Sequence, residues 1–220
     1  MTSEILAGLT VLIIGDSHLA SPNYLITSLH DDLTQKGANV HSLGICGSKP
    51  SDWLIASPAG KCGGAERLGK NPITIMDRSS ASTSPIKTLI AKDKPNVILV
   101  VMGDTLANYK QNFTNAWAWQ EVTSLTQEIS KTGTKCVWVG PAWGTEGGKF
   151  GKTFNRVKQV SSFLATNVAP CTYIDSLTMS KPGAWVTGDG EHFTPDGYKQ
   201  WSQEITKAFI KLPIMTNWKP

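Results

Sequence analysis

Residues 9–18 read LTVLIIGDSH, and this stretch decides the fold. Its first six residues form an unbroken apolar run rich in β-branched side chains, which is typical of a strand buried on both faces of a parallel sheet. Gly15 ends the run, and Ser21-Pro22 supplies the cap and first-turn proline of a helix. The stretch therefore predicts a strand, then a tight turn that carries Ser17, then a helix.

The same alternation of apolar runs and amphipathic segments continues along the chain. Because such an alternation produces right-handed βαβ units, we expect one domain over residues 1–220, an α/β fold with a five-stranded parallel sheet between two layers of helices. The long connection at residues 47–84 is expected to carry function. The further strands are expected at residues 39–43, 96–102, 135–139 and 171–174, and the helices at 21–37, 84–90, 112–131, 153–164 and 194–210.

Charge and hydropathy exclude two classes of protein. The chain has 21 Lys and Arg against 17 Asp and Glu, a net charge of +4, and the basic residues are scattered. A dedicated nucleic-acid-binding arm is therefore not expected. The longest apolar run, residues 97–102, is far shorter than the ~18 residues that a membrane span needs. We expect a monomer that binds neither nucleic acid nor membrane through this chain.

Four cysteines, at positions 46, 62, 136 and 171, bear on the compartment. They form no C-x-x-C motif and pair with no histidine at metal-ligand spacing, so we expect no metal and no cofactor. An even number fits two disulfides, which would indicate an oxidising compartment; four buried thiols are the alternative. Residues 1–7 lack the basic and apolar regions of a secretory leader, so an exported protein would be present here with its leader removed.

Two short motifs near opposite ends of the chain point to nucleophilic catalysis. Ser17 would lie at a strand-to-helix turn, where helix-end amides can stabilise an oxyanion. Asp189 precedes His192 by three residues, a spacing that lets the carboxylate hold one ring nitrogen while the other faces a nucleophile. Either motif alone could be an ordinary loop, but together they predict a Ser-His-Asp hydrolase. Glu191 is expected to point away from the imidazole, and His18 to pack or cap the helix start.

With these motifs the chain resembles the SGNH (GDSL-type) hydrolases along its whole length, in particular their carbohydrate acetylesterase and O-acetyltransferase branch. The matching blocks are GDSH at 15–18, a glycine within SLGICGS at 42–48, residues 103–108 and DGEH at 189–192. The resemblance implies a flavodoxin-like three-layer α/β/α sandwich. It also implies that Ser17 is the nucleophile, His192 the base and Asp189 its orienting carboxylate.

The family's oxyanion hole is only partly matched. The resemblance assigns two of its donors to the amides of Ser17 and Gly47, with Gly44 the weaker match. The third donor is the Asn of a G-x-N-D block, but Thr105 stands at that place here and Asn108 follows three residues later. Either side chain could donate, and we expect Asn108, because a carboxamide donates along a fixed direction whereas a hydroxyl rotates.

The same resemblance also implies how the four cysteines pair. Cys136 and Cys171 open neighbouring strands of a flavodoxin-like sheet, within the distance that a disulfide requires. Cys46 and Cys62 would then clamp the loop that holds Gly47 beside Ser17. The resemblance thus implies the pairs Cys46–Cys62 and Cys136–Cys171.

The first functional hypothesis is a periplasmic or secreted serine esterase that removes a small acyl group, acetyl above all, from a carbohydrate. Trp53, Trp143 and Trp185 lie on the expected rim loops and are candidates for stacking on a sugar, although tryptophan also packs in cores. The partner would be an acylated carbohydrate or polysaccharide.

Three alternatives keep part of this hypothesis. GDSH in place of GDSL resembles SGNH domains that accompany acyltransferases of envelope polysaccharides, so the acyl group could pass to a sugar hydroxyl instead of water. The missing block-three Asn would also fit a non-catalytic carbohydrate-binding module. A lipase or thioesterase for long acyl chains is the remaining alternative.

Overall fold

A computed structural model describes residues 4–58, 62–216 and 218. Its centre is a seven-stranded sheet in the order β4-β3-β2-β1-β5-β6-β7. Five strands are parallel, and they are the five that the sequence predicts, in the order typical of flavodoxin-like folds. These strands are β1 (Thr10–Gly15), β2 (Asn39–Ile45), β5 (Val97–Val101), β6 (Lys135–Val139) and β7 (Thr172–Ile174).

The sheet has seven strands and not the predicted five, because the connection between β2 and the next helix contains a hairpin. Strands β3 (Gly64–Leu68) and β4 (Thr74–Met76) pair antiparallel with each other, and β3 pairs antiparallel with β2. Both strands are short and half-exposed, as Leu68 and Ile75 show with 47% and 65% exposure. A strand that buries so little has no clear apolar pattern, so periodicity did not reveal it.

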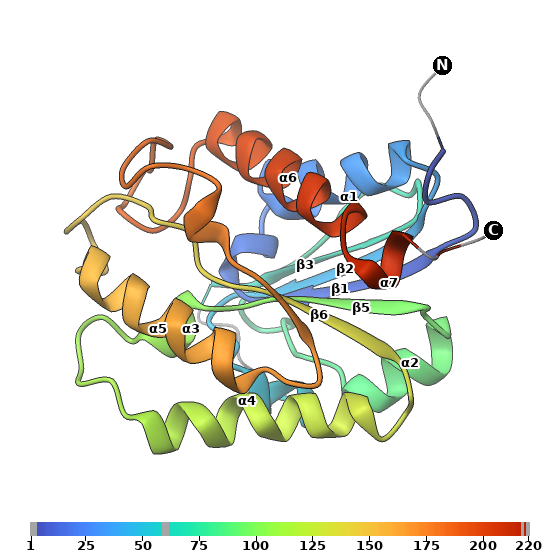
Figure 1. The fold of residues 1–220 in the computed structure, drawn as a ribbon, viewed down its shortest axis with the longest axis horizontal. Helices are drawn as coiled ribbons and strands as arrows, with labels where there is room; N and C mark the ends of the chain where they lie inside the picture. The colour runs from blue at the N-terminus through green and yellow to red at the C-terminus, as the bar shows by residue number, and fades with distance from the viewer. Residues whose placement is uncertain (1–3, 59–61, 217, 219–220) are drawn as a thin grey trace.

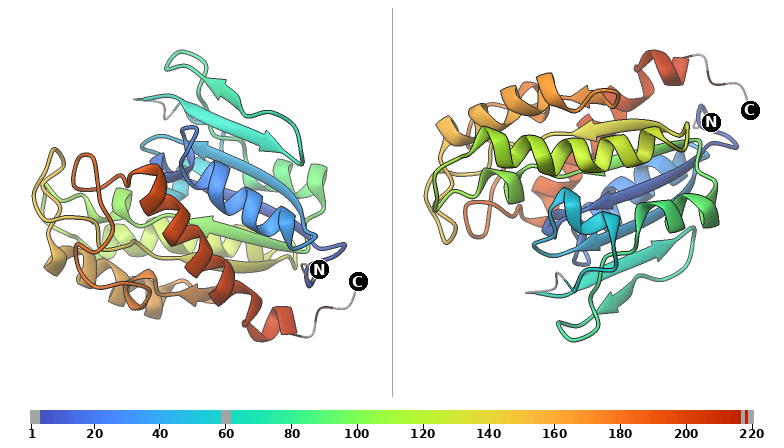
Figure 2. Two further views of the ribbon diagram at one scale, coloured as in Figure 1. Left: turned by 90° about the horizontal axis from the view of Figure 1, so that it is seen from above. Right: turned by 90° about the horizontal axis from the view of Figure 1, so that it is seen from below.

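Helices cover both faces of this sheet, which gives the expected three layers (Figures 1 and 2). One face carries α1 (Leu25–Gln35) and α6 (Pro195–Ile210), and the other carries α2 (Ile86–Asp93), α4 (Asn115–Ser130) and α5 (Phe154–Asn167). None of the helices in the described ranges is long and apolar enough to cross a bilayer. The shorter helices are η1 (Ser17–Leu19), η2 (Pro50–Leu54), α3 (Asp104–Ala107), η3 (Ser176–Thr178) and α7 (Pro213–Thr216).

The unbroken apolar run of β1 is explained by two separate cores. Val11 and Ile13 belong to the core beneath α1 and α6, whereas Leu12 and Ile14 belong to the core beneath α2, α4 and α5. All four side chains are fully buried. Since burying one such side chain contributes about 1.5–3 kcal/mol, β1 anchors both halves of the molecule and fixes the position of the turn that follows it.

The loops that follow β6 and β7 meet at the carboxyl end of the sheet, at the left of Figure 1. The Thr145 amide donates to the Gly190 carbonyl at 2.9 Å, and the Lys149 amide donates to the Asp189 carbonyl at 3.0 Å. These two bonds connect the predicted DGEH loop with the loop after β6. The rim expected from strand topology is therefore a single connected structure.

Two disulfides join the strands at the expected pairs of cysteines. Cys136 at the start of β6 is bonded to Cys171 just before β7, with 4.5 Å between Cα atoms. Cys46 after β2 is bonded to Cys62 before β3, with 5.5 Å between Cα atoms. The second bond closes the base of the loop that carries Gly47.

Removing either disulfide is expected to lower the free energy of unfolding. The effect should be larger for the disulfide that closes the longer loop. Loop-closure entropy gives about 4 kcal/mol for the 35-residue separation of Cys136 and Cys171 and about 3 kcal/mol for the 16-residue separation of Cys46 and Cys62. Urea denaturation of the two double Cys→Ala variants measures both values. Four free thiols in peptide maps of the unreduced protein would refute the pairing.

Candidate active site

Ser17 is held at the end of β1 by a sharp turn into η1. The Asp16 carboxylate accepts a hydrogen bond from the His18 amide at 3.1 Å and so caps η1. The turn folds back over β2, where a Cβ atom at Gly44 would lie only 2.3 Å from the Leu19 carbonyl carbon. Only glycine permits this approach, which leaves Ser17 at the carboxyl edge of the sheet.

The structure brings Ser17, His192 and Asp189 into one hydrogen-bonded chain. Ser17 Oγ lies 2.7 Å from His192 Nε2, and His192 Nδ1 lies 2.8 Å from Asp189 Oδ2. The other Asp189 oxygen accepts hydrogen bonds from the amides of His192 at 2.7 Å and Glu191 at 2.9 Å. Thr194 caps α6 directly after this loop and fixes it to the body of the fold. The arrangement is that of a nucleophile, a base and an orienting carboxylate.

The environment of His192 keeps its imidazole available as a base. Burial lowers its pKa and the charge on His18 lowers it further, while the hydrogen bond to Asp189 opposes both, and the net pKa is below 6.5. The ring stacks on Tyr24, with 5.9 Å between centroids, and meets the edge of Phe150 at 5.5 Å. The imidazole is therefore neutral at physiological pH and held in orientation by aromatic contacts on two sides.

A cavity of about 380 Å³ opens at Ser17 and His192. Gly47 lines it with a φ of +79°, a conformation that side-chain-bearing residues rarely adopt, and the Cys46–Cys62 disulfide borders it. Gly47 thus lies in the same cavity as the hydroxyl of Ser17, as an oxyanion donor must. The further lining residues are Asp104, Thr105, Asn108, Tyr109, Lys110, Phe150 and Glu191.

Thr105 and Asn108 both reach this cavity, but they differ in how free they are to donate. The Asn108 side chain is exposed and its amide already donates to Gln111 Oε1 at 3.0 Å. The Thr105 hydroxyl is buried and has no hydrogen-bond partner among the described residues. Because Thr105 lines the cavity and its hydroxyl has no bond to break, a rotation of the side chain would let it donate to a substrate oxygen. The geometry favours Thr105, whereas the sequence favoured Asn108.

Thr105→Val is expected to lower kcat by about 10² or more with little change in KM, because the lost bond would form mainly in the transition state. Asn108→Ala should stay within about threefold of the wild type. Steady-state kinetics on an acetyl ester measure both effects, with Thr105→Ser as the variant that keeps the hydroxyl. A larger loss in Asn108→Ala than in Thr105→Val would reverse this assignment.

The three tryptophans expected to stack on a sugar lie inside the fold instead. Trp53 is fully buried, and Trp143 and Trp185 are 8% and 7% exposed. Trp53 donates to Ser48 Oγ at 3.3 Å and Trp143 to the Leu177 carbonyl at 2.9 Å, and none of the residues that line the cavity at Ser17 is a tryptophan. Each ring buries a large apolar area and so holds its loop against the body of the protein. A sugar-stacking role is therefore corrected to a structural one.

A buried charged cluster that the sequence analysis missed lies directly behind the cavity. His18 Nε2 lies 2.7 Å from Asp104 Oδ2, and Lys152 Nζ lies 2.9 Å from Asp104 Oδ1, which also accepts the Tyr109 hydroxyl. Lys152 is fully buried. Burial opposes ionisation of Asp104, but Lys152 and His18 outweigh it and hold its pKa below the usual range. His18, with Nδ1 also 2.8 Å from the Tyr198 hydroxyl, packs the start of η1 as expected.

Only one set of side chains in the described ranges has the proximity that a metal ion requires. His18, Asp104 and Glu191 offer ligand atoms within 4.8 Å of one another. However, the Lys152 ammonium already neutralises Asp104, and His18 Nε2 already bonds to it. A bound cation would have to displace one of these partners, so we assign no metal to the cluster.

Glu191 lies closer to the triad than the sequence analysis expected. The two amides bonded to Asp189 Oδ1 curl the loop, and this brings Glu191 Oε1 to 3.8 Å from His192 Nε2. The side chain faces the cavity and does not point away from the ring. Asp189 still holds the other ring nitrogen, so the two carboxyl groups lie at opposite sides of the imidazole.

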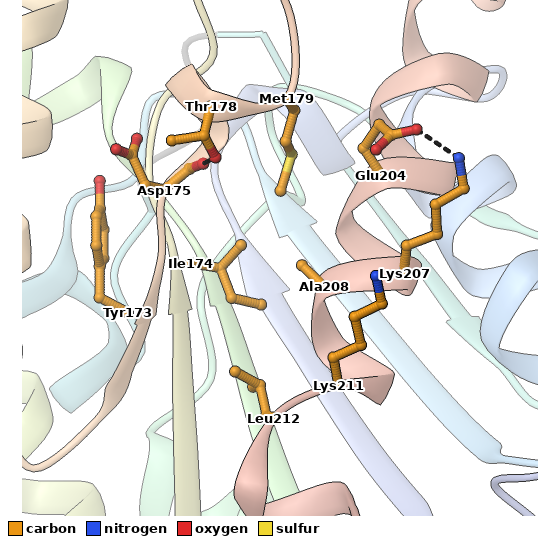
Figure 3. A pocket seen from close by; sticks show the side chains of 10 residues that line it. All are labelled: Tyr173, Ile174, Asp175, Thr178, Met179, Glu204, Lys207, Ala208, Lys211 and Leu212. Carbon is orange, nitrogen blue, oxygen red and sulfur yellow. Dashed lines mark hydrogen bonds and ion pairs between the residues drawn. The ribbon is translucent and has the colours of Figure 1, made fainter.

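A second cavity, of about 400 Å³, lies between β7 and α6 and is shown in Figure 3. Its polar side chains include an ion pair between Glu204 and Lys207, 2.6 Å apart. Its lining contains no histidine, serine or cysteine, and it shares no residue with the cavity at Ser17. This cavity therefore lacks the nucleophile and base that the cavity at Ser17 contains.

Comparisons with known proteins agree with the observed fold. No family model matches the chain. Protein BcsX of Komagataeibacter xylinus is 44% identical over 209 residues, which cover 94% of this chain and 79% of that protein. A carbohydrate acetylesterase family member from Sinorhizobium meliloti superimposes with a TM-score of 0.61 at 15% identity, covering 94% and 99% of the two chains. The periplasmic domain of a Salmonella ser. Paratyphi A lipopolysaccharide acetyltransferase superimposes with a TM-score of 0.60 at 14% identity, covering 92% and 84%.

Proposed function

Because this chain belongs to the family of Protein BcsX and has the SGNH hydrolase fold, we propose that it is a serine esterase that removes acetyl groups from a carbohydrate. The observation that carries the proposal is the hydrogen-bonded chain from Ser17 through His192 to Asp189, which opens into a cavity. The proposed residues are those that the sequence motifs singled out.

The proposed reaction has two steps. Ser17 Oγ attacks the ester carbonyl while His192 Nε2 takes the hydroxyl proton, and the proton then passes to the departing sugar oxygen. Water, deprotonated by the same imidazole, attacks the acyl-enzyme and releases acetate. The oxyanion of both tetrahedral intermediates would be stabilised by the amides of Ser17 and Gly47 and by the Thr105 hydroxyl.

The size of the cavity and the structural neighbours support a small acyl group on a sugar. About 380 Å³ is at the lower end of ligand cavities, and its lining includes polar side chains along with Phe150 and Tyr109. A long acyl chain would need a deeper apolar channel. One structural neighbour is described as a carbohydrate acetylesterase family member.

Transfer of the acetyl group to a sugar hydroxyl is the second candidate function, and the likeness to a lipopolysaccharide acetyltransferase domain favours it. The two disulfides support a location in an oxidising compartment, the periplasm or the cell exterior. Hydrolysis and transfer share the acyl-enzyme and differ only in the nucleophile that attacks it.

One assay tests both functions. Acetylated oligosaccharides are incubated with the protein, with and without an unacetylated oligosaccharide acceptor, and released acetate and acetylated acceptor are measured together. Acetate release that is independent of acceptor identifies an esterase, and acceptor acetylation at the expense of acetate identifies a transferase. No turnover of either kind above that of Ser17→Ala would refute the proposal.

A further inference from the structure

The proposed reaction leaves one buried carboxyl group at the active site without a role. Glu191 is 8% exposed and lines the cavity beside Ser17. In the part of the chain that the structure describes, no donor forms a hydrogen bond with its carboxyl oxygens, although its backbone amide bonds to Asp189. Neither oxygen is among the fully enclosed polar atoms that lack a partner, so the carboxyl group presents accessible surface to the cavity, where a ligand can reach it.

The position of Glu191 relative to His192 identifies which part of a substrate it would meet. During ester cleavage the departing alcohol oxygen must lie within a hydrogen bond of His192 Nε2, which gives it a proton. Glu191 Oε1 lies 3.8 Å from that same nitrogen. A hydroxyl on the carbon next to the ester oxygen would therefore fall within reach of the carboxyl group.

The surroundings of Glu191 favour its protonated form. Burial raises its pKa to about 8, with Asp104 and Asp16 acting in the same direction and His18 and Lys152 opposing them. Tyr109, Lys110 and His192 are the further titratable side chains that line the cavity with it. A neutral carboxyl group can donate to a sugar hydroxyl and adds no negative charge beside the developing oxyanion.

We propose that Glu191 is a specificity-determining residue that hydrogen-bonds the hydroxyl vicinal to the ester oxygen, and so selects esters of polyhydroxylated alcohols over simple esters. The inference rests on the proposed esterase function and extends it to the alcohol side of the substrate. A site built to bond a hydroxyl discriminates strongly against an analogue that lacks it, because its own polar group is then left unpaired.

Two acetates that differ by one hydroxyl test the contact: cyclohexyl acetate and trans-2-hydroxycyclohexyl acetate. The wild type should prefer the hydroxylated ester by about 10- to 100-fold in kcat/KM, the range expected for one hydrogen bond in a buried site. Glu191→Ala should lose this preference, so that the ratio of kcat/KM on the two esters falls to about one. Glu191→Gln should keep part of the preference, because an amide also donates.

The pH profile gives a second readout that a merely structural role would not change. Above pH 8 the wild-type kcat/KM on the hydroxylated ester should fall, since Glu191 becomes a carboxylate beside the oxyanion. In Glu191→Gln this alkaline fall should disappear. Glu146→Gln, an exposed glutamate on the neighbouring loop, is the matched control and should keep both the preference and the fall.

The outcomes separate this inference from the proposed function. Equal losses on both esters in Glu191→Ala, or an alkaline fall that persists in Glu191→Gln, would overturn the role of Glu191 while leaving the esterase in place. Wild-type turnover no faster than that of Ser17→Ala on either ester would overturn both. Thermal unfolding of each variant establishes that the compared proteins are folded.

Discussion

Replacing Ser17 by alanine is expected to reduce ester hydrolysis by at least about 10⁴-fold, the largest effect of any single substitution in this chain. The substitution removes the only protein atom that bonds to the acyl carbon in the proposed mechanism. His192 and the oxyanion donors remain, so a small residual rate is expected. Initial rates on p-nitrophenyl acetate and on an acetylated oligosaccharide measure the loss.

The same substitution should leave the fold intact. Ser17 lies at the edge of the sheet and its hydroxyl bonds only to His192 among the described residues, so the melting temperature should change by no more than a few degrees. A serine-directed sulfonyl fluoride should add one label per chain, on Ser17, and none to Ser17→Ala. Activity within tenfold of the wild type in Ser17→Ala would disprove the nucleophile assignment.

The parallel part of the fold is readable from sequence because its central strands, β1 and β5, bury both faces. Residues 11–14 and 97–102 contain no polar side chain, and the structure places them at the centre of the sheet. The β3–β4 hairpin could not be read in the same way, since Ile75 and Leu68 face solvent and the segment is held to β2 by backbone hydrogen bonds. Backbone pairing leaves little trace in side-chain pattern.

The candidate site likewise contains residues that the sequence identified and residues that it did not. Ser17, Asp189 and His192 were identifiable because they lie in short motifs whose internal spacing carries the geometry. Lys152 was not identifiable, because the glycine-rich loop contains both Lys149 and Lys152 and no sequence signal shows which of the two is fully buried. The burial of Lys152 depends on Asp104, 48 residues earlier in the chain, and so on tertiary structure alone.

For the tryptophans the sequence predicted too much, because their number suggested a sugar-stacking role that the structure does not support. Trp53 and Trp143 lie near the rim in sequence, but their indole nitrogens bond to the protein and their rings are buried. Apart from Cys62 and Phe150, the residues that line the cavity belong to the family's motif blocks or directly follow one of them. Glu191, within DGEH, is the clearest case.

Asp189→Asn is expected to lower kcat by about 10⁴, because an amide in this place can donate to His192 Nδ1 and so stabilise the wrong tautomer. Asp189 Oδ2 accepts from Nδ1 at 2.8 Å, which leaves Nε2 free to take the Ser17 proton. The negative charge on Asp189 also raises the pKa of His192. Its removal should therefore shift the acid limb of the pH-rate profile to lower pH.

The comparison that decides this assignment is between the carboxyl groups on the two sides of the imidazole. Asp189→Asn should reduce kcat on p-nitrophenyl acetate far more than Glu191→Gln does, since this substrate has no vicinal hydroxyl and its turnover depends on the triad alone. Asp196→Asn, an exposed carboxylate in the first turn of α6, controls for the loss of charge near the site. If Glu191→Gln were the more damaging of the two, Glu191 would be the carboxylate on which His192 depends, and the imidazole would have to work with its ring nitrogens exchanged.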